Sequence, residues 1–241
     1  MANTKIRKPD TAVNDELMKK LTEIGVLYSH KRSKAHPNMR PFIGANRHEI
    51  DILDARAVID SINKSSHFLE KVLGKKEGGL VLFVGTSPAA RDLVENLSRK
   101  LNQPHVVNRW LGGTLTNFDV IKDRIKYYQE MKKKQKEGEF EKYTKKEQLD
   151  LANEIEKLTY KFDGLVNLDR LPDAVFLVDI EAENTALRES QKLDIPVVAI
   201  IDSNDNPDEV NYPIIANDHN RSSIQWVVET LKDNLIKNKN G

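Results

Sequence analysis

The sequence predicts an α/β protein with a parallel sheet of about five strands, helices on both faces of the sheet, and an inserted two-helix hairpin. From Gly44 onward, short apolar runs alternate with amphipathic helical patterns, which is typical of parallel strands joined by crossover helices. The runs at 80–84, 174–178 and 196–201 are apolar without interruption, as expected for strands covered on both faces. Between residues 117 and 162 the period changes to the spacing of paired helices.

Residues 1–47 predict an N-terminal helix followed by a basic loop. Apolar residues recur at helical spacing across residues 12–24, Thr11 or Asn14 can cap this helix, and Gly25 can end it. Residues 26–47 contain prolines, glycine, and basic and aromatic side chains without a sustained period. We therefore expect a loop with a basic and aromatic surface.

Residues 48–116 and 163–241 form the predicted α/β domain. Asp54 is placed to cap a helix that ends before Gly74, and Pro88 suits the first turn of a helix that runs to about Leu101. The predicted strands are at 50–53, 80–84, 105–107, 174–178 and 196–201, with a short edge strand at 214–216, and two further helices are expected at 183–192 and 221–236.

Residues 117–162 predict a coiled-coil hairpin inserted into this domain. Two series of positions at alternating spacings of three and four residues form the seam: Phe118, Ile121, Ile125, Tyr128 and Lys132, then Leu151, Ile155, Leu158 and Phe162. The turn is expected at residues 137–139. Thr144 and Glu147 have the spacing of a capping box, in which the two side chains satisfy free N–H groups at the start of the second helix.

Composition excludes several classes of function. The 241 residues contain no cysteine, which excludes disulfides, thiolate nucleophiles and cysteine-bound metals. The chain starts without an apolar leader-like segment and has no apolar run of about 18 residues, so we expect a soluble cytoplasmic protein with no membrane partner.

The net charge of +1 conceals a segregation of charge along the chain. Residues 1–47 hold ten basic and four acidic side chains, and residues 122–146 hold ten basic and five acidic ones. Residues 163–220 instead hold three basic and thirteen acidic side chains. Two basic segments and an acidic one predict a surface that binds a polyanion and a different surface that faces other partners.

No group of residues predicts a catalytic or metal site. The Gly85-Thr86-Ser87 turn resembles a phosphate-binding turn, but the glycine patterns of nucleotide-binding loops are absent and every parallel sheet needs such turns. His30, His36 and His48 lack the spacing of metal ligands, so RNA contact or loop packing explains them better. Four acidic residues lie near strand ends, where α/β enzymes place magnesium or catalytic carboxylates, and they are Asp179, Asp202, Asp205 and Asp208. The segment 202–207 resembles a calcium loop but lacks its glycine and terminal glutamate, so turn formation explains it better. We predict neither a cofactor nor a small-molecule substrate.

The loop Arg109-Trp110-Leu111-Gly112-Gly113 combines a planar ring, a positive charge and a backbone that a ligand can approach closely. Such a loop can stack on and bind a nucleic acid. Alternatively, Trp110 anchors the base of the hairpin to the sheet, and the two roles are compatible.

At this loop the sequence resembles the bacterial-type small-subunit ribosomal protein two family. Further matches in the same order extend the resemblance over about residues 14–236, and they are Leu115-Thr116-Asn117, Leu171-Pro172-Asp173-Ala174, Ile195-Pro196-Val197-Val198-Ala199-Ile200, Tyr212-Pro213-Ile214, Asn217-Asp218 and, upstream, Leu82-Phe83-Val84-Gly85-Thr86. The resemblance implies a flavodoxin-like sheet with an inserted coiled-coil hairpin, small-subunit ribosomal RNA as the binding partner, ribosomal protein one and other small-subunit proteins as neighbours, and no catalysed reaction.

We therefore predict a structural constituent of the small ribosomal subunit that binds RNA through its basic surfaces and offers an acidic surface to neighbouring proteins. The predicted RNA-binding residues are Lys31, Arg32, Lys34, Arg40, Arg47, Arg109 and Trp110, with a second group on the hairpin at Lys126, Lys132, Lys133, Lys134 and Lys136. Alternatives are a flavodoxin-like phosphate-ligand-binding enzyme that uses the Gly85 turn, and a coiled-coil adaptor that binds only protein.

Overall fold

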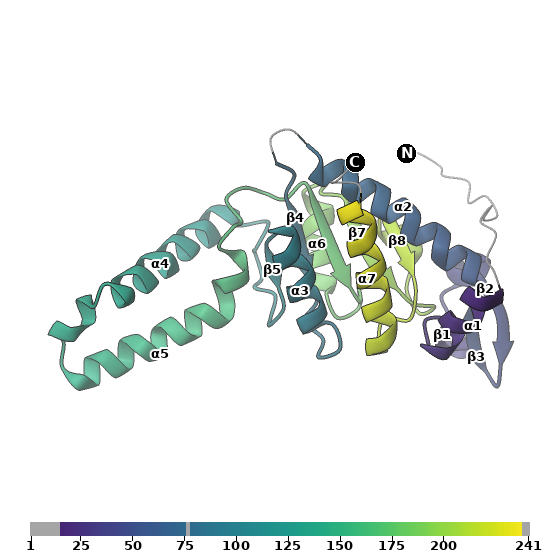
Figure 1. Ribbon diagram of the computed structural model, residues 1–241, viewed down its shortest axis with the longest axis horizontal. Helices are drawn as coiled ribbons and strands as arrows, with labels where there is room; N and C mark the ends of the chain where they lie inside the picture. The colour runs from purple at the N-terminus through teal and green to yellow at the C-terminus, as the bar shows by residue number, and fades with distance from the viewer. Residues whose placement is uncertain (1–14, 76–77, 238–241) are drawn as a thin grey trace. The chain divides into compact units, whose positions relative to one another are not determined.

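The computed structural model describes residues 15–75 and 78–237 (Figure 1). The chain divides into two compact units. The first unit contains the residues up to Lys71 together with 178–181 and the residues from Val198 onward, and the second contains 72–177 and 182–197. Thr11 and Asn14, the predicted caps of the first helix, lie outside the described residues.

The central element is a five-stranded sheet with the strand order β5-β4-β6-β7-β8. These strands are β4 (Val81–Val84), β5 (His105–Val106), β6 (Ala174–Val178), β7 (Val197–Ile201) and β8 (Tyr212–Ile215). The pairs β4–β5, β4–β6 and β7–β8 are parallel, and every residue of β4, β6 and β7 is buried. The predicted α/β class and the five-stranded parallel sheet are confirmed, and the last strand lies at the edge, as predicted.

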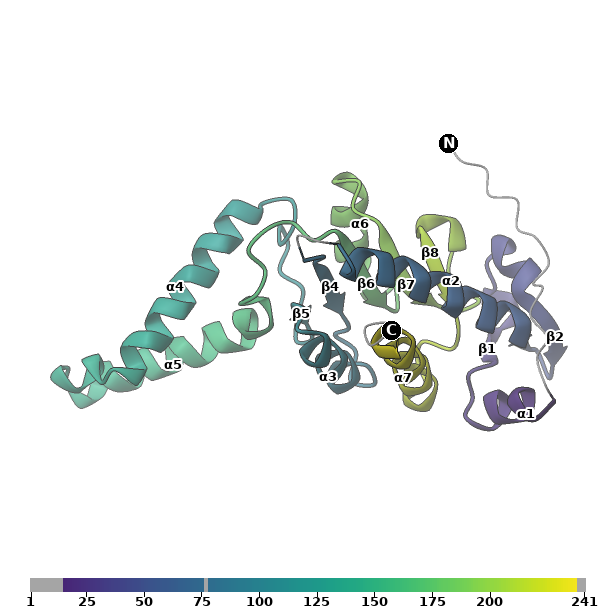
Figure 2. The same ribbon diagram turned by 45° about the horizontal axis from the view of Figure 1, so that its top comes forward.

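In the second unit, α3 (Arg91–Leu101) and α6 (Asn184–Lys192) lie on opposite sides of strands β4 and β6 (Figure 2). Phe83 on β4 and Phe176 on β6 are directly paired, and their ring centroids are 5.4 Å apart. Helix α3 ends at Leu101 as predicted, but the predicted start at Pro88 is wrong. Residues 88–90 form a turn that leads into the helix, and the N–H groups of Ala90 and Arg91 both donate to the Ser87 carbonyl.

The first unit contains most of α2 (Ala55–Leu73), α7 (Arg221–Lys237), most of β7 and all of β8. The side chain of Asp54 accepts a hydrogen bond from the Arg56 N–H at 2.9 Å, which confirms the predicted cap. Helix α2 packs against β8 through the Phe68 ring, which stacks on Tyr212 with a centroid distance of 3.9 Å.

The region before α2 differs from the expected loop. After α1 (Asp15–Glu23), the chain forms a three-stranded antiparallel sheet of order β1-β3-β2, made of β1 (Tyr28–Lys31), β2 (Ile43–Arg47) and β3 (Ile50–Leu53). The prediction of a loop over 26–47 is therefore wrong at both ends, and the strand predicted at 50–53 belongs to this small sheet. Strands β1 and β2 are four and five residues long and contain no buried residue, so no alternation of apolar and polar residues marks them.

Two helices, α4 (Phe118–Lys136) and α5 (Lys145–Phe162), occupy the segment predicted as a hairpin and are joined through the short helix η3 (Glu139–Lys142). Figures 1 and 2 show them running next to one another. The hydroxyl of Tyr127 on α4 donates to Glu154 on α5 at 2.9 Å, and the Thr144–Glu147 capping box is confirmed. The coiled-coil packing of the seam and the boundaries of the three segments stay predictions.

Candidate nucleic-acid interface

Five of the predicted RNA-binding residues lie in the first unit, around the small antiparallel sheet. They occupy the end of β1, the 3₁₀ helices η1 (Arg32–Lys34) and η2 (Pro37–Phe42), and the end of β2, and they are Lys31, Arg32, Lys34, Arg40 and Arg47. All five are exposed, and none forms an ion pair within the described part of the chain. Their charges are therefore available to an external anion.

The register of the small sheet brings two of these cations into one row. Lys31 on β1 and Arg47 on β2 are both paired with Ile50 on the central strand β3. Directly opposed residues of antiparallel strands project on the same face, so Lys31 and Arg47 flank Ile50 on that face about 10 Å apart. Separations in the sequence do not reveal this pairing.

The loop that contains Arg109 and Trp110 is held by one buried carboxylate, Glu189 on α6. Glu189 is 8% exposed and accepts five hydrogen bonds of 2.8–3.2 Å, which come from the Trp110 indole N–H, the backbone N–H groups of Gly113, Leu115 and Thr116, and the Thr116 hydroxyl. Burial alone would raise the pKa of Glu189, but these hydrogen bonds outweigh it and lower the pKa below the usual value. The bond to Trp110 favours the anchoring interpretation, with α6 as the attachment point.

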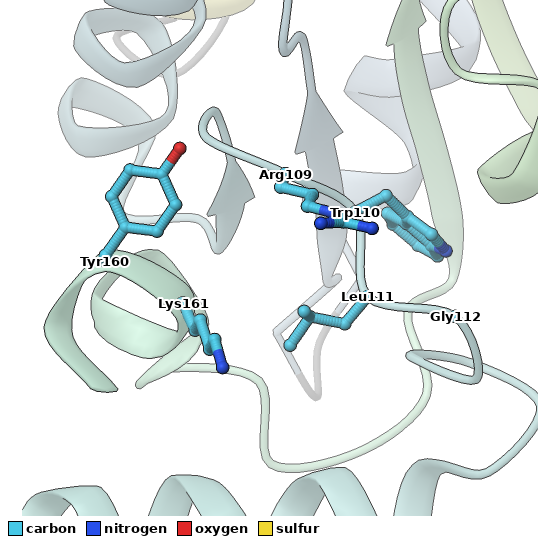
Figure 3. Close-up of a pocket in the computed structure, with 6 residues that line it drawn as sticks. All are labelled: Arg109, Trp110, Leu111, Gly112, Tyr160 and Lys161. Carbon is cyan, nitrogen blue, oxygen red and sulfur yellow. The ribbon is translucent and has the colours of Figure 1, made fainter. Parts of the chain in front are cut away.

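A cavity of about 350 Å³ opens beside this loop (Figure 3). Its lining comes from two segments only, residues 109–112 and the last turn of α5 at Tyr160 and Lys161. Figure 3 shows Tyr160 and Lys161 on one side and Arg109 and Leu111 on the other. The Asn108 side chain donates to the Tyr160 carbonyl at 2.8 Å and fixes the loop to the end of α5.

The predicted hairpin lysines differ in their surroundings. Lys132 donates to Asp163 at 2.8 Å and lies 4.9 Å from the Tyr128 ring centroid, so its charge is used within the fold. Lys126 and Lys133 are exposed and have only long ion pairs, at 3.5 Å with Asp123 and at 3.8 Å with Glu137. The remaining two, Lys134 and Lys136, are exposed and form no ion pair among the described residues.

Helical geometry groups some of these lysines with one that the sequence analysis missed. At 100° per residue, Lys122, Lys126 and Lys133 lie within about 40° of one another, on the side of α4 away from its buried residues. Lys134 points to a different side. The spacing of four between Lys122 and Lys126 could have identified Lys122 from the sequence.

The turn after β4 is occupied by a carboxylate of the protein. Glu183 is 2% exposed, and its Oε1 accepts from the Thr86 N–H at 2.7 Å and from the Thr86 hydroxyl at 2.6 Å. A bound phosphate would need the same donors and would meet the negative charge of Glu183. The geometry therefore does not favour the alternative of a phosphate-ligand-binding enzyme at Gly85.

A cluster of histidine and aspartate side chains lies in the first unit, at the ends of β6 and β7. His30 Nδ1 lies 3.1 Å from Asp202, and ligand atoms of His30, Asp202 and His219 are within 4.8 Å of one another, as are those of Asp179, Asp218 and His219. Hydrogen bonds to Asp202 and Asp218 raise the pKa values of His30 and His219, that of His219 to about 9. Imidazole nitrogen with carboxylate oxygen is a donor set that could hold Zn²⁺.

Of the three histidines that the sequence places together, only His30 belongs to this cluster. The His36 ring accepts from the Asn38 N–H and caps η2, and His48 lies in the turn between β2 and β3 with a φ of 49°. The carboxylate partner of His30 comes from Asp202, 172 residues later, so no local spacing could indicate it.

The structure thus gathers the predicted residues into separate groups. The first unit carries Lys31, Arg32, Lys34, Arg40 and Arg47 on and next to its small sheet. The second unit contains Arg109, Trp110 and the predicted lysines of α4. Sequence reasoning missed Glu189, Tyr160 and Lys161, which fold against the Arg109 loop from distant parts of the chain. None of the helices in residues 15–75 and 78–237 has the length and apolarity to cross a bilayer.

Comparison with known proteins gives one consistent result. The chain matches the family described as Ribosomal protein S2 over residues 21–238. Relatives named small ribosomal subunit protein uS2 include that of Coprothermobacter proteolyticus, 38% identical over 93% of this chain and 83% of the relative, and that of Dehalococcoides mccartyi, 35% identical over 92% and 90%. A third, from Roseiflexus castenholzii, is 37% identical over 92% of this chain and 84% of the relative. This chain therefore belongs to the ribosomal protein S2 family.

Proposed function

We propose that this protein is a structural constituent of the small ribosomal subunit that binds ribosomal RNA without catalysing a reaction. The observation that supports this proposal best is the group of five exposed cations around β1, β2 and β3, which form no ion pair with any residue in 15–75 or 78–237. Such cations bind phosphates and release the counterions condensed on a nucleic acid. The proposal places the protein on ribosomes in the cytoplasm.

The lysine group on α4 supplies a second contact in this proposal. Lys122, Lys126 and Lys133 share one side of the helix, and an RNA strand or groove can follow such a row of charges. Lys132 is left out of the contact because Asp163 neutralises it.

Neighbouring ribosomal proteins, with ribosomal protein one among them, are the proposed partners of the acidic residues. The exposed acids of the segment 163–220 are Asp169, Glu181, Asp194, Asp208 and Glu209. Acidic residues at the rim of an interface steer basic partners and set specificity more than affinity.

Sedimentation with small subunits tests the proposed function. We expect the purified full chain to co-sediment with subunits from the same organism, and rising KCl or ribonuclease treatment to release it, because phosphate contacts are screened by salt. Co-sedimentation that resists both treatments would indicate a protein partner instead. A chain that stays apart from the subunits at low salt contradicts the proposal.

A further inference from the structure

The cavity beside the Arg109 loop is large enough to receive a small organic group. Its volume of about 350 Å³ lies in the usual range for sites that enclose a small organic group, about 300–1,000 Å³. The six lining residues are Arg109, Trp110, Leu111, Gly112, Tyr160 and Lys161. All six belong to the second unit.

The charge of the lining favours an anion. Arg109 and Lys161 are both positive, and neither forms an ion pair within residues 15–75 and 78–237. No acidic residue of the described chain lines this cavity. The adjoining cavity shares Arg109, Tyr160 and Lys161 with it and is also lined by one further cation, Arg91, and by three acids, Glu95, Glu156 and Asp163. A negatively charged group that enters the first cavity therefore meets two positive charges that form no ion pair among the described residues.

The aromatic content favours a planar group beside that anion. The Tyr160 side chain is 54% exposed, and no other described ring stacks on it. In Figure 3 the indole of Trp110 is turned away from Tyr160, in keeping with its bond to Glu189. An exposed ring next to two cations is the combination that binds an unstacked base together with its phosphate.

The backbone segments that carry the lining residues are held in place before any ligand arrives. Glu189 holds the loop from one side, and Asn108 ties the loop to the Tyr160 carbonyl from the other. Asp163, three residues after Tyr160, accepts from Tyr128 and Lys132 and so fastens the end of α5 to α4. A preorganised site loses little entropy on binding, which favours a specific ligand.

We propose that this cavity receives one unpaired nucleotide of the RNA, with its base on the Tyr160 ring and its phosphate between Arg109 and Lys161. The inference rests on the proposed function and adds which kind of nucleotide the second unit recognises. In an A-form duplex the bases are stacked and paired, so only a bulged, looped or flipped nucleotide can enter a cavity with an aromatic wall.

Variants at Tyr160 and Gly112 distinguish the contribution of the cavity to RNA binding from that of the surrounding positive charges. Tyr160→Ala removes the stacking surface, whereas Tyr160→Phe keeps it, and Tyr143→Ala removes an exposed ring of the hairpin turn as a matched control. Gly112→Leu adds an apolar side chain at a residue that lines the cavity. A Cβ at Gly112 has no neighbour within 4 Å and the φ is not positive, so this substitution leaves the loop intact.

The experiment rebinds each full-length variant to small subunits from which this protein has been removed, and measures its affinity by sedimentation. We expect Tyr160→Ala and Gly112→Leu to bind about ten- to a hundredfold more weakly, as for the loss of one stacked base, and Tyr160→Phe and Tyr143→Ala to bind like the unmodified protein. With p-benzoylphenylalanine in place of Tyr160, irradiation should crosslink a single unpaired nucleotide, mapped by primer extension.

Two results would separate a failure of this inference from a failure of the proposed function. If Tyr160→Ala binds subunits normally in a salt-sensitive way, or if the crosslink joins position 160 to a protein or to paired nucleotides, the cavity does not hold an unpaired nucleotide and the RNA-binding proposal stands. If the unmodified chain does not bind the subunits, both proposals fail together.

Discussion

At the scale of single residues, the stability of the second unit depends on carboxylates that accept hydrogen bonds from the protein in place of water. Glu189 is the clearest case, because one buried carboxylate accepts five bonds from a loop on which Arg109 and Trp110 are carried. An amide at this position would keep one acceptor oxygen but would turn an N–H₂ group toward N–H donors. The loop would then keep only part of its attachment to α6.

We therefore expect Glu189→Gln to lower the free energy of unfolding by about 1–3 kcal/mol, the cost of leaving buried donors unpaired. Urea unfolding measures this change. In a Trp226→Phe background, the fluorescence of Trp110 should shift to longer wavelength as the indole becomes more exposed to water. Glu130→Gln, an exposed change on α4, is the control and should alter neither quantity. An unchanged urea midpoint for Glu189→Gln would show that the loop does not depend on this carboxylate.

Asp173 makes a contribution to the stability of the folded state that depends on pH. Its side chain is 16% exposed, and burial alone would raise its pKa, but bonds from Lys75, the Leu80 N–H and Arg170 outweigh burial and lower the pKa to about 2. A depressed pKa stabilises the folded state fully above the unfolded value of 3.8, and this contribution is lost as the pH falls through about 2. Both cations are about half exposed, so we set the contribution at about 1–2 kcal/mol.

Asp173→Asn should therefore destabilise the protein by about 1–2 kcal/mol at pH 7, with the difference from the unmodified protein shrinking as the pH falls from 4 toward 2. Urea unfolding at a series of pH values measures this difference. Asp169→Asn, an exposed change four residues earlier, should have little effect at any pH. A difference for Asp173→Asn that is constant with pH would mean that charge is not its cause.

The same acids show why charge counting overestimates the acidic surface. Of the thirteen acidic residues in 163–220, six are buried, namely Asp179, Glu183, Glu189, Asp202, Asp205 and Asp218. The sequence gives their number and sign, but their partners lie far away along the chain, as Thr86 does for Glu183. Burial depends on tertiary structure, so a count of charges cannot distinguish a carboxylate that fastens a loop from one that faces solvent.

At the scale of elements, prediction succeeds where a pattern is long or chemically specific. The uninterrupted apolar runs indicate β4, β6 and β7, and the capping residues mark the starts of α2 and α5. It fails for β1 and β2, because these short strands on a small exposed sheet bury few side chains. The start of α3 was misplaced because a proline that suits a first helical turn also suits a β-turn.

The lysine row on α4 allows a prediction for an element as a whole. Replacing Lys122, Lys126 and Lys133 by Gln keeps the helix, since the two residue types have similar helix propensities. If the row contacts RNA phosphates, the slope of log K against log salt should fall by about two to three, because each contact releases about 0.7–0.9 counterions. Sedimentation with small subunits at several KCl concentrations gives this slope.

The matched control replaces three exposed lysines on other helices, Lys71 on α2, Lys100 on α3 and Lys192 on α6. This variant has the same net charge as the triple variant of α4, so a general effect of charge changes both slopes equally. A triple variant of α4 that behaves like the control would remove α4 from the proposed interface.

At the scale of the whole molecule, the two basic groups lie in different compact units, so RNA binding by both would make one ligand contact both units. Phosphate contacts contribute to the salt dependence independently, because each releases its own counterions. Replacing Lys31, Arg32, Lys34, Arg40 and Arg47 by Gln should lower the slope by about four, and combining these changes with the α4 triple should lower it by the sum of the two. Sedimentation at several KCl concentrations measures this slope for the combined variant and for the two variants in which one group is replaced. If the combined variant has the same slope as one of these two variants, only the group replaced in that variant binds RNA.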